Sequence, residues 1–207
     1  MAKSEILKQL VNNEITLEIG LGRLMIIASD IGNQELYDWA EKELMGYGKE
    51  DELPPNRILK MGQMLYSGIN GSFQVTNVPL PLGWIPDIAV NMLNNNRHIE
   101  GIAAIQEYAN RESGYVGRDC GFLAGEIGKH GVQCYEITMR HGAQEYVNML
   151  AKIRTKLISV FIRLDKEFGN LDDLDVDVSG QKRKERKILD NELRDIIFYD
   201  NTSEVIN

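Results

Sequence analysis

The sequence predicts an α+β fold dominated by helices, with an N-terminal helical bundle, a small antiparallel sheet or hairpin, and a long C-terminal helix. Three observations lead to this prediction. Apolar residues recur at helical spacing over residues 3–47, β-rich runs flank the pair Asn70-Gly71, and a longer helical stripe covers residues 144–168. With 207 residues, 43% of them hydrophobic and 26% charged, the chain can build a sizeable core.

Three helices are expected in the N-terminal bundle. The first two carry apolar stripes around Leu10 and Leu24, at the spacing of a helix with one buried face. Gly20 and Gly22 interrupt the second stripe. Because a glycine inside a helix costs about 1 kcal/mol relative to alanine, we expect both to mark close packing against a neighbouring helix. Asn33 is the expected N-cap of the third helix.

The third helix carries Trp39, and Tyr47 follows on the same face. A tryptophan beside a tyrosine is typical either of a ligand or partner site or of aromatic residues that cap a small core. We favour the core for both residues. Glu41 and Glu43 are interpreted as solvated charges of this helix.

The middle of the chain is expected to form the sheet. Pro54 and Pro55 interrupt the helical pattern because proline lacks a backbone donor and fixes φ. Asn70-Gly71 favours a hairpin with a type I′ turn, whose two central residues both need positive φ. Further elements are predicted along the chain: helices over residues 87–94 and 98–111, an irregular glycine-rich stretch over 114–131, and a strand over 132–140.

The C-terminal third divides into a long amphipathic helix over residues 144–168 and a tail. Acidic residues and then the basic block Lys182–Lys187 indicate a charged linker, so we place one domain at 1–169 and a linker with a helical, apolar tail at 170–207. The apolar stripe of the tail must be buried on its own domain or on another chain. We expect a homo-oligomer, with a dimer favoured, whose interface residues are Leu189, Leu193, Ile196, Ile197 and Phe198.

Charge and cysteine content restrict the location and the partners. The net charge of −8 argues against broad binding of nucleic acid, and Lys182–Lys187 has no interleaved aromatic residues, so a nucleic-acid partner is unsupported. No apolar run approaches the roughly 20 residues of a membrane-spanning helix, and no secretory signal is visible. Cys120 and Cys134 are expected as reduced thiols of a cytoplasmic protein without membrane contact.

The chemically versatile residues match no metal or cofactor motif. The chain has three histidines, His98, His130 and His141, and their spacing with the cysteines fits no zinc pattern, so no metal is expected. Neither a GxxxxGK[ST] loop nor a GxGxxG turn after a strand is present, so no cofactor is expected either. Residues 125–131 are interpreted as a loop. No nucleophile elbow identifies catalytic residues, which stay unknown.

The best candidate for a ligand site lies where the strand over 132–140 passes into the long helix. Arg140 and His141 precede a helix start, and the free N–H groups at a helix N-terminus favour anions. A structural cap is the simpler interpretation of the same residues. The candidate anion-binding set comprises Arg140, His141 and His130.

Two stretches carry a family signature. The first reads Gly32-x-x-Glu35-Leu36-x-x-Trp39-Ala40-x-x-Glu43-Leu44-x-Gly46-Tyr47, and the second is Leu53-Pro54-Pro55-Asn56-Arg57. The long helix with Arg154-x-x-Leu157 and Leu164-Asp165 follows the same pattern. These residues resemble the AbiTii domain, which belongs to a family of bacterial abortive-infection proteins that stop phage growth at the cost of the host cell. The resemblance covers about residues 6–168.

The resemblance implies phage defence as the biological context and supplies no catalytic residues. Two functions stay open. The first is a non-enzymatic sensor or interaction module that a phage or host protein triggers and that acts by oligomerising. The second is a toxic effector that acts on nucleic acid or nucleotides through an anion-binding site near Arg140 and His141. The missing catalytic motifs favour the first.

Overall fold

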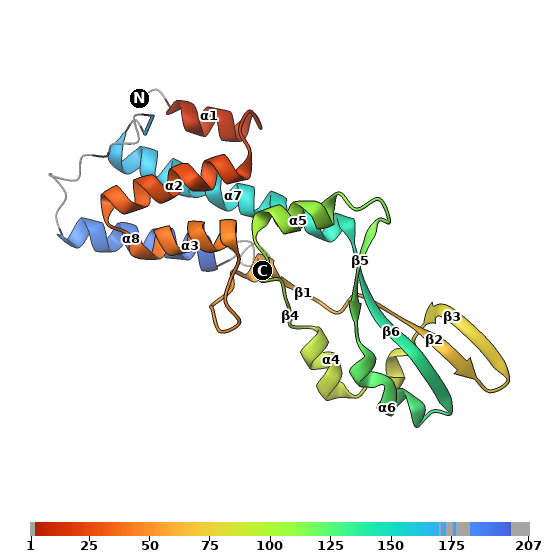
Figure 1. Cartoon of the computed structure of the whole chain (residues 1–207). Coiled ribbons are helices and arrows are strands. Elements are labelled where there is room, and N and C mark those ends of the chain that lie inside the picture. The colour runs from red at the N-terminus through yellow and green to blue at the C-terminus, as the bar shows by residue number, and fades with distance from the viewer. Residues whose placement is uncertain (1–2, 170, 173–175, 177–182, 200–207) are drawn as a thin grey trace, which may run out of the picture. The chain divides into compact units, whose positions relative to one another are not determined.

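A computed structural model describes residues 3–169, 171–172, 176 and 183–199 (Figure 1), so most of the predicted linker lies outside the described residues. These residues form eight α-helices and a four-stranded antiparallel sheet, which confirms the predicted helix-dominated α+β fold. The chain divides into two compact units. The helical unit comprises Met1–Arg57, Ile99–Ile105 and Asn148–Asn207, and the sheet unit comprises Ile58–His98 and Gln106–Val147. This division splits the predicted domain 1–169 between the two units, and residues 183–199 of the predicted tail belong to the helical unit.

Helix ends in the helical unit are set by capping residues. Thr16 accepts a hydrogen bond from the backbone N–H of Ile19, and Asn33 accepts one from Leu36, which confirms Asn33 as an N-cap. Gly32 ends the second helix at φ +66°, a left-handed conformation that glycine adopts at low cost. The elements of this unit are α1 (Glu5–Val11), α2 (Leu17–Ile31), α3 (Gln34–Met45), the 3₁₀ turn Pro55–Arg57, α8 (Arg183–Phe198) and most of α7 (Ala143–Phe168).

The core of the helical unit lies between α2, α3 and α7. Its fully buried side chains include Leu21, Leu24, Ile27, Leu36, Ile153, Leu157, Phe161 and Leu164. The amphipathic helix predicted over 144–168 is confirmed as α7. At its start the buried face includes Tyr146 and Met149, whereas Val147 is 41% exposed. Positions 146, 149 and 153 follow one helical face, and Val147 lies beside it. Within the described part of the chain, no helix combines the length and apolarity needed to cross a membrane.

The two glycines of α2 have different surroundings. A Cβ atom on Gly20 would lie 2.8 Å from the Cδ2 atoms of both Leu10 and Leu157. Gly20 therefore marks close helix packing, as predicted. A Cβ atom on Gly22 would meet nothing within 4 Å, so the prediction for Gly22 is wrong. This glycine lines an open groove with Met25.

The carboxylate of Asp165 on α7 anchors the start of α1. It accepts hydrogen bonds from the backbone N–H of Ser4 and from Nζ of Lys3, both at 3.1 Å. Burial raises the pKa of Asp165, but the hydrogen bonds from Lys3 and Ser4 outweigh it, and the pKa lies below its ordinary value. The ionised carboxylate therefore stabilises the folded chain.

The sheet unit is built on four antiparallel strands in the order β3-β2-β6-β5 (Figure 1). The strands are β2 (Gln63–Asn70), β3 (Phe73–Pro79), β5 (Tyr115–Asp119) and β6 (Val132–Gly142), and a separate ladder pairs β1 (Ile58–Leu59) with β4 (Asn96–Arg97). The predicted hairpin is confirmed, with its turn shifted by one residue. Asn70 pairs with Phe73, so Gly71 and Ser72 are central. Of these two central residues, Gly71 has positive φ (+61°) and Ser72 does not, which fits a type II′ turn rather than type I′.

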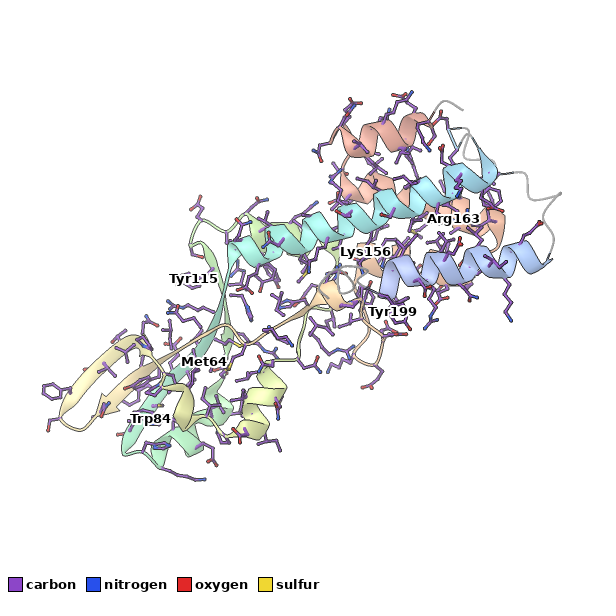
Figure 2. The ribbon with its side chains drawn as sticks, turned by 180° about the vertical axis from the view of Figure 1, so that it is seen from behind. Met64, Trp84, Tyr115, Lys156, Arg163 and Tyr199 are labelled. Atoms are coloured by element: carbon purple, nitrogen blue, oxygen red, sulfur yellow. The ribbon has the colours of Figure 1, made fainter. Side chains whose placement is uncertain are left out.

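Two short helices pack against the sheet and close its core. They are α4 (Asp87–Leu93), predicted over 87–94, and α6 (Ala124–Gly128), and the 3₁₀ turns Leu82–Trp84 and Gly121–Leu123 precede them. The core includes Met64, Tyr66, Leu80, Ile85, Ala89, Leu93, Leu123, Ile127, Ile137 and Met139; Figure 2 labels Met64 and Trp84 in this region. Cys120 is buried and Cys134 half-buried, and both are free thiols, as predicted.

The stretch 114–131 was expected to be irregular but contains β5 and α6. Four of the five residues of β5 are exposed, so the strand has no alternation of apolar and polar residues by which the sequence could reveal it. Its pairing with β6 provides the backbone hydrogen bonds.

The helix expected over 98–111 is shorter, because α5 spans Ile102–Ala109. The preceding backbone is extended and packs on the end of α3. The carbonyl of Ile99 accepts the N–H of Tyr47 at 2.7 Å, and a Cβ on Gly101 would lie 2.4 Å from the carbonyl oxygen of Leu44. This tertiary contact overrides the helical spacing of the sequence.

Replacing the two α2 glycines by alanine is expected to have opposite effects. Gly22→Ala should raise the free energy of unfolding by about 0.5–1 kcal/mol, because the site is open and alanine favours the helix. Gly20→Ala should lower it, because the new methyl group meets Leu10 and Leu157. Urea unfolding measures both, and equal stabilisation by the two changes would contradict the packing at Gly20.

Asp165→Asn is expected to lower the free energy of unfolding by about 1–3 kcal/mol at neutral pH. Because the native pKa is depressed, this contribution is present above the unfolded-state pKa of about 4 and is lost as the pH falls through the native pKa. Urea unfolding of wild type and variant at a series of pH values should show the difference shrinking in acid. A difference that does not depend on pH would rule out the ionised anchor.

Candidate functional site

A buried polar network surrounds His141 in the sheet unit. Nδ2 of Asn96 donates to Nε2 of His141 at 2.9 Å and lies 3.1 Å from Nε2 of His98. Oδ1 of Asn96 accepts from Arg118, which fixes the orientation of the amide. Nδ1 of His141 lies 2.7 Å from a carboxylate oxygen of Glu145. His141 therefore accepts at Nε2 and donates from Nδ1.

The side chains at the centre of this network are buried, so the network stabilises the fold of the sheet unit. His141 is 2% exposed, and His98 and Asn96 are also buried. The ring of Tyr146 meets His98 edge-on, with centroids 5.2 Å apart. The network joins β4, β5, β6 and the first turn of α7, and both nitrogens of His141 are used in doing so. It ties the end of β6 to the first turn of α7 through the contact of His141 with Glu145.

Arg140 and His130 lie apart from this network. Neighbouring residues of a strand face opposite sides, so the side chains of Arg140 and His141 point away from each other. Arg140 donates to Asn77 at 2.9 Å, and its guanidinium lies 4.2 Å from the ring centroid of Tyr115. Figure 2 labels Tyr115. His130 is exposed and stacks on Trp84, with centroids 5.0 Å apart. It precedes β6, so about 30 Å of strand separate it from His141.

The predicted anion-binding set is corrected accordingly: Arg140, His141 and His130 do not converge, and the charged neighbour of His141 is a carboxylate. Residues 125–131 form part of α6 and the turn after it rather than a free loop. Among the described residues, no three His, Cys, Asp or Glu side chains are grouped so as to hold a metal ion.

The apolar stripe of α8 packs inside the helical unit. Leu189, Leu193 and Ile197 are each 1% exposed within the single chain, while Ile196 and Phe198 are half-buried. Of the two alternatives that the sequence left open for this stripe, its own domain or another chain, the structure shows burial on its own chain. The physical reason is that α8 docks on α3 and α7 of its own chain.

Polar contacts hold α8 along its length. Near its start Arg186 donates to the carbonyl of Ile31, and at its middle Asp190 accepts from Nδ2 of Asn33 at 2.7 Å. At its end the buried Lys156 of α7 donates to the carbonyl of Ile197. A cation at a helix C-terminus also interacts favourably with the helix dipole. Arg163, further along α7, pairs with Glu192, and Figure 2 shows Lys156 and Arg163 on the α7 ribbon.

The signature residues of the sequence form a buried ion pair in the helical unit. The guanidinium of Arg57 donates to Glu43 through Nε and Nη2, and through Nη1 to the carbonyl of Glu100 at 2.7 Å. Both side chains are buried, so the interpretation of Glu43 as a solvated charge is wrong. The hydroxyl of Tyr47 donates to Glu43 at 2.8 Å, and burial together with the Glu43 charge raises the pKa of Tyr47. Tyr47 therefore stays a donor.

A cavity of about 290 Å³ lies beside this ion pair, and we call it the Trp39 pocket. Its lining consists of Glu35, Asp38, Trp39, Lys42, Tyr47, Glu52 and Phe198. Trp39 and Tyr47 are buried, as predicted, and they also form the aromatic part of this lining. Asp38 and Lys42 were not among the predicted site residues, although with Glu35 they repeat at helical spacing on the face of α3 that carries Trp39.

The fold and the pocket define an α+β protein whose signature residues build a small polar and aromatic cavity on a helical unit. A sequence model of the AbiTii family matches residues 3–188. The chain belongs to the AbiTii family, as the resemblance predicted, and this membership indicates abortive-infection phage defence. Comparisons with curated proteins and with solved structures found no match.

Breaking the buried ion pair is expected to be costly only when one charge is left behind. Glu43→Leu should lower the free energy of unfolding by about 3–5 kcal/mol, because Arg57 stays buried without its counter-ion. Adding Arg57→Met should recover most of this loss. Urea unfolding of the two variants tests the pair, and a double variant as unstable as the single one would contradict it.

Burial of α8 within one chain predicts how Leu193→Ala behaves. The change should lower the free energy of unfolding by about 2–5 kcal/mol, equally at low and high protein concentration. The exposed Ile188 of the same helix serves as the control, since Ile188→Ala should stay within about 0.5 kcal/mol. A loss that depends on protein concentration would instead indicate that α8 packs on a second copy.

Proposed function

We propose that the protein serves abortive-infection phage defence as a non-enzymatic sensor that binds its trigger in the Trp39 pocket. The observation that carries the proposal is the position of the family signature: Trp39 and Tyr47 line a cavity, and the buried pair beside it holds Tyr47 in place. A small concave site with a few polar groups and aromatic walls is the usual form of a ligand pocket.

The hydrogen bonding in the sheet unit supports a sensor over an effector. The ring nitrogens of His141 are engaged by Asn96 and Glu145, whereas a general base or anion ligand needs a nitrogen that faces its substrate. Arg140 lies on the other side of the strand, against Tyr115. Among the described residues, the set expected for the effector function, Arg140, His141 and His130, is therefore not assembled, and the effector function becomes an outcome of the test.

Phage plating tests the proposal in cells. Bacteria that express the wild-type protein should form fewer plaques than cells with an empty vector. Asp38→Lys, which reverses a half-buried charge of the pocket, should restore plaque formation. Its matched control Glu41→Lys makes the same change at an exposed position of α3 and should stay protective, and thermal unfolding confirms that both variants fold.

Arg140→Gln separates the two functions in the same assay. A sensor that uses the Trp39 pocket keeps its protection in this variant. Loss of protection in Arg140→Gln together with full protection in Asp38→Lys would overturn the proposal and favour an effector that uses the sheet unit.

A further inference from the structure

We propose that the Trp39 pocket binds an organic cation, a guanidinium or primary ammonium group carried on a slim chain. The inference rests on the proposed function, since it names the ligand class of the same site. The lining holds one ammonium group, that of Lys42, against a larger number of carboxylates and aromatic rings. The carboxylates are those of Glu35, Asp38 and Glu52, and the rings those of Trp39, Tyr47 and Phe198.

Arg194 of α8 shows which group these carboxylates accept. Its guanidinium forms ion pairs with Glu35 and with Glu52, the latter at 3.4 Å, and lies 5.4 Å from the ring centroid of Phe198. Carboxylates and an aromatic face are the partners that suit a planar guanidinium. Arg194 thus shows that this kind of lining suits a guanidinium, and it engages Glu35, Glu52 and Phe198 within the chain. A ligand cation would contact the rest of the lining, Asp38, Trp39 and Tyr47.

Asp38 supplies charge for a second cation. It is half-buried, and its Oδ1 accepts from Nε2 of Gln34 at 2.6 Å, a neutral donor that leaves the carboxylate charge uncompensated. The cation in the lining, Lys42, pairs with Asp51 at 3.0 Å, outside the lining. The lining therefore keeps an excess of negative charge.

Trp39 adds an aromatic wall, and the face of an indole ring attracts a guanidinium or ammonium group. Its indole Nε1 is buried and has no hydrogen-bond partner among the described residues. The volume of about 290 Å³ suits one small cation or one basic side chain.

Indole signals in a nuclear magnetic resonance titration of the full chain provide the test. The chain has two tryptophans, so the indole N–H of Trp39 reports on the pocket and that of Trp84 on the sheet unit. The probes are agmatine, N-acetylarginine amide and the neutral isostere N-acetylcitrulline amide. Both cations should shift the Trp39 signal to saturation and leave Trp84 unchanged, and the neutral compound should shift neither.

The two cations distinguish the sources of the ligand. A response to agmatine alone supports a free small cation, and a response to N-acetylarginine amide alone supports a basic side chain of a partner protein. Asp38→Asn should weaken binding about two- to fivefold, as for loss of one partly exposed ion pair. Glu41→Gln removes the same charge from an exposed position of α3 and should leave the affinity unchanged.

Three results would overturn the inference: an unmoved Trp39 signal, an equal response to the neutral isostere, or equal weakening by Asp38→Asn and Glu41→Gln. Its failure is separable from failure of the proposed function. Absence of cation binding with pocket-dependent phage protection intact removes only the ligand class. Cation binding without phage protection removes the proposed function and leaves the site.

Discussion

The arrangement of the helical unit depends on the buried ion pair between Arg57 and Glu43. One guanidinium joins three segments that are distant in the sequence: the last turn of α3, the 3₁₀ turn Pro55–Arg57 and the extended backbone at Glu100. Charges removed from water stabilise a fold only where their hydrogen bonds are satisfied. Here the second carboxylate oxygen of Glu43 accepts from Tyr47, which fixes the position of that ring. One wall of the Trp39 pocket is thus set by the ion pair.

In the sheet unit the buried polar network is organised by the neutral side-chain amide of Asn96 and not by an ion pair. Asn96 donates to His141 and contacts His98, and it accepts from Arg118, so its one side chain connects β4, β5 and β6. A satisfied polar network of this kind rigidifies a core. His98 and His141, the histidines of this network, therefore serve a structural role. The Trp39 pocket is lined instead by acidic and aromatic side chains and one lysine.

Local patterns in the sequence predicted the elements that local physics determines. The cap at Asn33, the stripe of α7 and the hairpin near Gly71 depend on spacing, capping and turn chemistry, and all three were found. β5 was missed because its exposed residues do not alternate. The prediction that Glu43 is solvated is wrong because its partner, Arg57, lies in a turn 14 residues later in the sequence. The burial of both side chains follows from tertiary packing, which a local pattern does not contain. The pocket needs Phe198 of α8, so no local pattern could define it.

The central claim is that the buried ion pair shapes a ligand pocket, and the double variant Glu43→Leu with Arg57→Met tests it most directly. This variant replaces the pair by apolar side chains and removes the acceptor of Tyr47 without touching the carboxylates that line the pocket. The measurement is its affinity for N-acetylarginine amide, read from the indole signal of Trp39. The account predicts a folded protein with weakened binding of the cation, and binding as tight as that of the wild type would contradict it.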